Sequence, residues 1–118
     1  MGNAIIDKSE ALAVRIVRLR NYLQNEKQEY DMSRQLARSG TSIGANIAEA
    51  HHAVSDADFV NKLSIALKEC GESIYWIKTL WKTDYLNDIE FDSINKDLNE
   101  VYALLISIIK SMKRRLNR

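Results

Sequence analysis

The residues that most resemble a reactive or metal-binding site are Glu49 and His52, three positions apart in a segment expected to be helical. A helical Glu-x-x-His motif puts both side chains on one face, and two such motifs with two further carboxylates bind a di-metal centre in some bundles. The only two histidines, His51 and His52, are adjacent, so they point about 100° apart on a helix. The second histidine ligand is missing, and a solvated helix end is the alternative interpretation. We expect no metal or other cofactor.

Glu69 and Glu72 are a second candidate, because two nearby carboxyl groups can act as an acid–base pair. The alternative is structural, with Lys68 and Glu72 as i,i+4 partners and Glu69 paired with a neighbouring helix or with water. Cys70, the only cysteine, falls on the apolar face, which favours a buried core residue over a reactive thiolate. No serine is spaced recognisably from a histidine and an acid, so the sequence predicts a protein that is not an enzyme.

Charge is distributed unevenly near the C-terminus. Residues 84–100 contain six acids and one lysine, whereas the last nine residues contain five bases and no acid: Lys110, Lys113, Arg114, Arg115 and Arg118. This order suits the helix dipole, so a solvated helix end is one interpretation. The other is a patch that binds the phosphates of RNA or DNA, joined by Arg15, Arg18 and Arg20 of the first helix. No aromatic side chain is interleaved in this tail, so base stacking is not indicated.

The composition indicates that these residues lie on helices of a single domain. The chain has 118 residues, with 46% hydrophobic and 28% charged residues, which is typical of one soluble domain. It has no proline and only four glycines, too few turn residues for a protein built from hairpins. The net charge of +1 excludes a protein whose whole surface is basic and binds nucleic acid on every side.

Apolar residues recur at spacings of three and four along most of the chain, which predicts an all-α protein. Four amphipathic helices are expected near residues 7–25, 31–52, 55–83 and 87–115. Short connections between them favour an antiparallel up-down four-helix bundle, formed by residues 1–118 as a single domain.

Polar residues at the expected helix starts provide caps of differing quality. The two clear capping boxes are Ser55-x-x-Asp58 and Asn87-x-x-Glu90. Each is flanked by an apolar pair that predicts a hydrophobic staple, Val54 with Phe59 and Leu86 with Phe91. The first two helices have weaker caps, at Asp7-x-x-Glu10 and at Asp31. The alternative for the first helix is a start a few residues before Asp7.

Two features predict self-association. Between Val101 and Ile109 only Ser107 is strongly polar, so one buried stripe would leave apolar side chains in water. Gly40 and Gly44 share a helix face, which predicts close helix contact or, alternatively, a break or kink between them. The predicted interface residues are Gly40, Gly44, Tyr102, Ile106 and Ile109.

No segment predicts a membrane or secretory protein. The longest apolar stretch, Val101 to Ile109, is far shorter than the roughly 20 residues that cross a bilayer. The N-terminal residues lack a basic leader followed by an apolar core. We therefore expect a cytoplasmic protein with no membrane partner.

Two segments carry a family resemblance. Residues 34–50, RQLARSGTSIGANIAEA, resemble the QLRRA-x-x-SI-x-x-NIAEG stretch of a bacterial four-helix-bundle family, named for proteins encoded in intervening sequences of 23S ribosomal RNA genes. Residues 66–77, ALKECGESIYWI, resemble its second signature, A-x-x-E-x-x-E-x-x-YW. The chain departs from the pattern at Gly44, where the family often has proline, and at Ala50, where it usually has glycine.

The resemblance implies a ring-like homopentamer without established catalytic activity. Relatives include accessory proteins of diversity-generating retroelements, which bind nucleic acid and assist a reverse transcriptase. The leading prediction is a non-enzymatic homo-oligomeric scaffold or adaptor that associates with RNA. The alternatives are a retroelement accessory protein and, as a third class, a di-metal carboxylate bundle.

Overall fold

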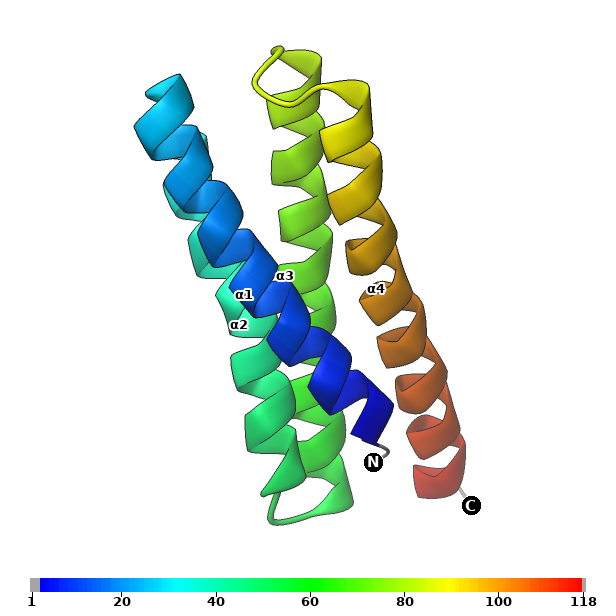
Figure 1. Ribbon diagram of the computed structural model, residues 1–118. Helices are drawn as coiled ribbons and strands as arrows, with labels where there is room; N and C mark the ends of the chain where they lie inside the picture. Colours follow the sequence, from blue (N-terminus) through cyan, green and yellow to red (C-terminus); the bar gives the residue numbers. More distant parts are fainter. Residues whose placement is uncertain (1–2, 118) are drawn as a thin grey trace.

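The computed structural model describes residues 3–117 and forms an antiparallel up-down bundle of four α-helices, as predicted (Figure 1). The helices are α1 (Asn3–Lys27), α2 (Asp31–His51), α3 (Asp56–Lys82) and α4 (Asp88–Leu116). The bundle is elongated, with extents of 51 × 21 × 21 Å. Within the described residues, no helix is both long and apolar enough to cross a membrane.

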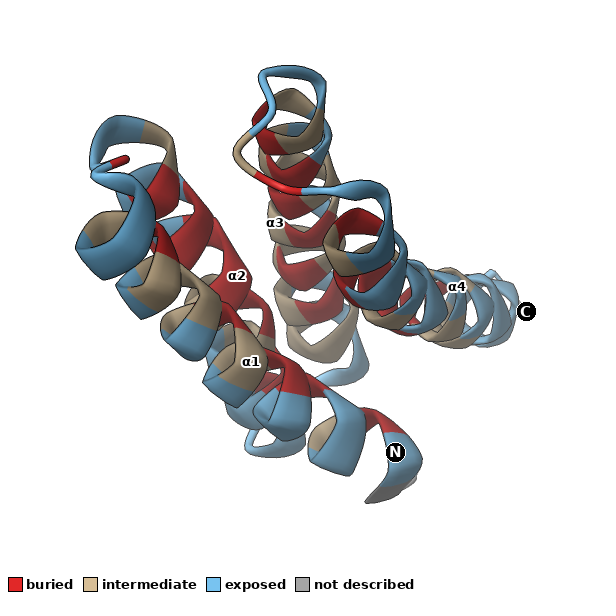
Figure 2. Ribbon diagram, turned by 45° about the horizontal axis from the view of Figure 1, so that its top comes forward, coloured by how far each residue is buried: buried red, intermediate tan, exposed pale blue. Residues whose placement is uncertain are grey.

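Each helix buries one apolar stripe against its neighbours, and the buried stripes face one another (Figure 2). The largest side chains with almost no exposure come from all four helices and include Leu12, Ile16, Leu36, Ile43, Leu63, Ile77, Leu98 and Leu105. Helix α2 lies between α1 and α3, and α3 lies between α2 and α4. Helix α1 meets α4 less extensively, and Figure 1 shows the two helices diverging toward the end where α4 begins.

The capping box of α4 is confirmed, whereas that of α3 is partly formed. The Asn87 side chain accepts a hydrogen bond from the Glu90 N–H, and the Glu90 carboxylate accepts one from the Asn87 N–H. Leu86 and Phe91, the staple pair of α4, are both buried.

At the start of α3, the Ser55 hydroxyl accepts a hydrogen bond from the Asp58 N–H at 3.0 Å. The Asp58 carboxylate accepts from the N–H of Val54, one residue before the cap. The Val54 side chain is 91% exposed, so the staple predicted between Val54 and Phe59 is wrong.

The predicted caps of the first two helices are not formed. Helix α1 begins at Asn3, which agrees with the alternative of an earlier start, and Asp7 lies inside the helix. At α2, the cap comes from Glu29 and not from Asp31. The Glu29 carboxylate accepts hydrogen bonds from the N–H groups of Met32 and Ser33 at 3.1 and 2.7 Å. The residue before it, Gln28, has a φ of 52°, and this left-handed turn brings Glu29 back over the helix start.

The predicted close approach of a helix to Gly40 and Gly44 is confirmed, and the helix is α1 of the same chain. A Cβ atom on Gly40 would lie 2.7 Å from Ile16 Cγ2, and one on Gly44 would lie 3.4 Å from the Ser9 carbonyl oxygen. Helix α2 is continuous through both glycines, so the alternative of a break between them is wrong.

Three residues of the predicted interface are therefore corrected. Gly40 is buried, and α1 covers the side of α2 on which both glycines lie, so the face of Gly40 and Gly44 is not available to a second copy. Ile109 is only 7% exposed and belongs to the chain's own core. Tyr102 and Ile106 are half-buried and remain candidates.

Alanine substitutions at the two glycines should distinguish the effect of packing on the free energy of unfolding from the effect of helix propensity. Gly40→Ala should lower the free energy of unfolding by about 1–3 kcal/mol, because the new methyl group overlaps Ile16. Gly44→Ala should change it by less than about 1 kcal/mol, because the gain in helix propensity offsets a contact near normal van der Waals distance. Urea denaturation followed by circular dichroism measures both, and equal effects would contradict this account of the α1–α2 contact.

Candidate nucleic-acid interface

Four of the predicted basic residues lie together at the C-terminal end of α4. Lys110, Lys113, Arg114 and Arg115 are all exposed, whereas Arg118 lies outside the described residues. In Figure 1 this end of α4 lies beside the chain terminus marked C. We call the four described residues the basic end of α4.

The acids of α4 lie toward the opposite end of the same helix. Residues 88–100 include five acids and one lysine, and they occupy the first half of α4. A helix of 29 residues is about 44 Å long, so most of these acids lie well away from the basic end. Nucleic acid approaching α4 would therefore meet repulsion at one end and attraction at the other.

The structure does not bring Arg15 and Arg18 to the basic end. Arg15 forms an ion pair with Asp97 and donates hydrogen bonds to the carbonyl and hydroxyl oxygens of Ser93 at 3.3 and 2.9 Å. Asp97 precedes Lys110 by thirteen residues, or about 20 Å along the helix. Because α1 runs antiparallel to α4, Arg18 is farther away still. Both residues are dropped from the candidate interface.

A second contact between these helices lies nearer the basic end. Lys8 forms an ion pair with Glu100. The hydrogen bond to the Glu100 carboxylate and the negative charge of that carboxylate raise the pKa of Lys8. The Lys8 ammonium group is therefore engaged with α4 and does not add to the basic end.

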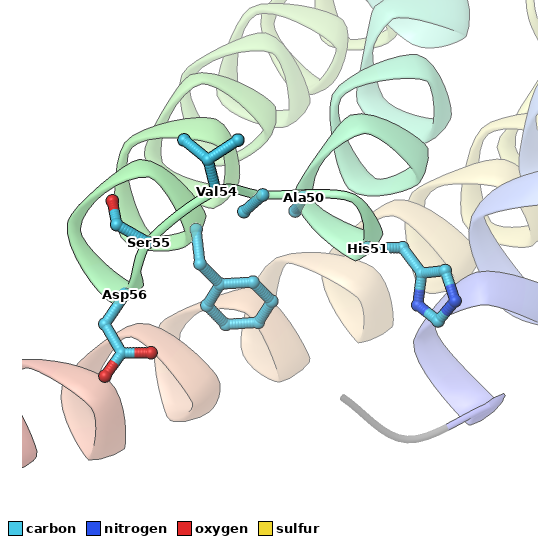
Figure 3. Close-up of a pocket in the computed structure, with 7 residues that line it drawn as sticks. Ala50, His51, Val54, Ser55 and Asp56 are labelled. Atoms are coloured by element: carbon cyan, nitrogen blue, oxygen red, sulfur yellow. The ribbon is translucent and has the colours of Figure 1, made fainter.

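A hollow at the α2–α3 connection adjoins the basic end (Figure 3). Its volume is about 400 Å³, and it is lined by Ala50, His51, Ala53, Val54, Ser55, Asp56 and Phe59. The Asp56 carboxylate lies 3.8 Å from a terminal guanidinium nitrogen of Arg115. This acid therefore offsets part of the charge of Arg115, whereas no ion pair is found for Lys110, Lys113 or Arg114 with any described residue.

The Glu49-x-x-His52 motif is not assembled into a metal site. Glu49 lies 3.3 Å from the ammonium group of Lys62, and His52 lies just beyond the last residue of α2. Its ring packs edge-on against His51, with ring centres 5.2 Å apart. Among residues 3–117, no group of three or more His, Cys, Asp or Glu side chains is placed to hold a metal ion.

Glu69 and Glu72 both pair with Arg38 of α2. One guanidinium nitrogen of Arg38 lies 3.3 Å from Glu69, and the other contacts Glu72. Glu72 also accepts a hydrogen bond from the indole of Trp76 at 3.2 Å. The cross-helix partner predicted for Glu69 is confirmed, and the predicted Lys68–Glu72 pair is wrong because Arg38 takes its place. The sequence offered no sign of this partner, because Arg38 lies on another helix.

Cys70 is a buried core residue, as predicted. Its side chain has no exposed surface, and its Sγ donates to the carbonyl oxygen of Leu98 at 3.3 Å. Burial raises the pKa of the thiol to about 12, because an apolar environment disfavours the thiolate.

The comparisons with known proteins agree with the fold. A family model described as 23S rRNA-intervening sequence protein matches residues 2–107. A crystal structure from Bacteroides thetaiotaomicron, described as a protein with unknown function from the S23 ribosomal protein family, is 56% identical in sequence. It matches with a TM-score of 0.91 and covers 92% of this chain and 96% of its own. No curated protein matches the chain.

Thiol reactivity tests the burial of Cys70. In the native state at neutral pH the thiol should react with a disulfide reagent such as DTNB far more slowly than an exposed cysteine, because it is buried and protonated. The reaction should become fast in urea, when the core opens. Rapid native-state labelling at neutral pH would show that the α3–α4 core is looser than described.

Proposed function

The chain belongs to the 23S rRNA-intervening sequence protein family, and we propose that it is a non-enzymatic scaffold that assembles with copies of itself and binds RNA. Helix α4 carries this proposal, because it combines a half-buried apolar stripe with an exposed basic end. The first surface suits protein association and the second suits phosphates. The proposal includes a cytoplasmic location, where RNA is available.

The assembly surface that we propose is the outer side of α3 and α4. Tyr102 and Ile106 stand one turn apart on α4 and are both half-buried. A Cβ atom on Gly71 would lie 4.0 Å from the Tyr102 ring, which places this ring beside α3. Leu67 and Ile74 share the helix face of Gly71 and are also partly buried. We call these five residues the α3–α4 face.

A partly covered apolar face on a single chain supports association, because contiguous apolar surface on soluble proteins usually marks an interface. Closed rings form when one surface of each copy meets a different surface of the next. A homopentamer is the arrangement implied by the family resemblance, and the number five rests on that resemblance alone.

Assembly would make weak phosphate contacts useful. Each copy would present one basic end of α4, so that a single RNA strand could engage several copies at once. Lysine and arginine contacts to phosphates carry little sequence information, so binding would tolerate many sequences. The adaptor function would then be to hold RNA on a ring of repeated weak sites.

Disruption of the α3–α4 face should dissociate the assembly. Ile106→Asp should shift the mass measured by light scattering to that of a 13.5 kDa monomer, because a buried unpaired carboxylate opposes association. Ser107→Asp adds the same charge to an exposed neighbouring position and should leave the mass unchanged. A monomeric unmodified protein at micromolar concentration would contradict the proposed assembly.

Neutralisation of the basic end should weaken RNA binding. Lys113→Ala/Arg114→Ala/Arg115→Ala should reduce retardation of RNA in gel shifts at low salt. It should also lower the salt dependence of log K by about 0.7 per lost contact to single-stranded RNA. Stability should be nearly unchanged, because exposed charges contribute little to folding.

The matched control removes three exposed lysines from α3, through Lys68→Ala/Lys78→Ala/Lys82→Ala. It changes the net charge equally and should retain most of the binding. Equal loss in both variants, or no retardation of any RNA by the unmodified protein, would mean that the basic end of α4 is only a solvated helix end.

A further inference from the structure

A groove on the outer side of α1 and α2 is lined by three arginines that the proposed function does not use. Its volume is about 360 Å³, and its lining residues are Val17, Arg20, Gln24, Arg34, Ala37, Arg38 and Thr41. No acidic side chain is among these residues. The groove is therefore a cationic concavity on a protein whose net charge is only +1.

The helices explain why the arginines surround a hollow. Arg34 and Arg38 stand one turn apart on α2, so their side chains leave the same face of the helix. Ala37 lies between them and is only 8% exposed, which provides a short apolar floor. Arg20 comes from α1, which is held close to α2 where Gly40 contacts Ile16.

The three guanidinium groups differ in how many of their N–H donors already bind an acceptor within the chain. Among the described residues, Arg34 has neither an ion pair nor a hydrogen bond from its side chain, and Arg20 donates only from Nε, to Asn21 at 3.2 Å. Arg38 is different, because it is fixed by Glu69 and Glu72, whose two negative charges exceed its single positive charge. Arg20 and Arg34 therefore supply the free donors, and Arg38 forms a rigid wall.

We propose that this groove binds a phosphate group, with Arg20 and Arg34 donating to its oxygens from opposite helices. A planar guanidinium presents paired N–H donors that match two phosphate oxygens, so two such groups on facing helices can enclose one phosphate. The phosphate could belong to a nucleic-acid backbone or to a small phosphate compound, because both present the same oxygens.

The groove is separate from the surfaces of the proposed function. Arg34 lies near the start of α2, and the basic end of α4 lies at the opposite end of the bundle (Figure 1). Neither Tyr102 nor Ile106 lines the groove. The inference therefore stands whether or not the basic end of α4 binds RNA and whether or not the chain assembles.

Isothermal titration calorimetry at low salt tests the groove with two probes, pyrophosphate and a short oligouridylate. The background is the variant Lys113→Ala/Arg114→Ala/Arg115→Ala, so that the basic end of α4 does not contribute. In this background Arg20→Gln/Arg34→Gln should weaken binding about tenfold or more, because two charge-assisted interactions are lost. The control Lys68→Gln/Lys78→Gln removes the same charge from exposed positions on α3 and should bind as tightly as the background.

The two probes identify the source of the phosphate. Binding of pyrophosphate alone would assign the groove to small phosphate compounds, and binding of the oligouridylate alone would assign it to a nucleic-acid backbone. No heat with either probe would overturn the proposal, as would equal weakening in the α3 control. Circular dichroism of each variant confirms that it is folded, which is expected because Arg20 and Arg34 make no ion pair with the described residues.

Discussion

The close contact of α1 with α2 at Gly40 is the constraint on which the arrangement of this bundle depends. Helix α1 touches α4 over a limited stretch, so its position is set mainly by α2. The absence of a side chain at Gly40 lets Ile16 pack directly on the α2 backbone. The same short distance places Arg20 opposite Arg34 and makes Ala37 the floor of the arginine groove. One core contact thus shapes the surface above it.

Ion pairs between α1 and α4 affect the surface charge of the bundle more than its stability. The pairs Lys8–Glu100 and Arg15–Asp97 link α1 to α4, and all four side chains are 39–45% exposed. Exposed pairs of this kind contribute little to the free energy of unfolding. Their consequence for function is the distribution of charge that remains. They neutralise acids in the middle of α4, and among residues 3–117 the basic end has one acidic ion-pair partner, Asp56.

The α2–α3 contact shows how residues that resemble a reactive site can be structural. Arg38 joins Glu69 and Glu72 at the surface, and beneath them the hydroxyl groups of Ser39 and Ser73 are 2.8 Å apart in the core. The carboxylates are therefore engaged with a guanidinium and not with each other as an acid–base pair. Arg38 is also a wall of the arginine groove, so the α2–α3 contact and the candidate phosphate site share this residue.

Features that depend on near neighbours in the chain could be predicted from the order of residues alone. Periodicity predicted the four helices and the burial of Cys70, and the spacing of Asn87 and Glu90 predicted the cap of α4, because these interactions join residues three or four positions apart. The partners that meet across helices were found only in the folded bundle. Arg15 and Asp97 are 82 residues apart, and Arg38 and Glu72 are 34 apart. Such pairs depend on the rotation and crossing of whole helices, which no local pattern encodes. For the same reason the sequence identified a close contact at Gly40 but assigned it to a second copy, whereas packing gave it to α1.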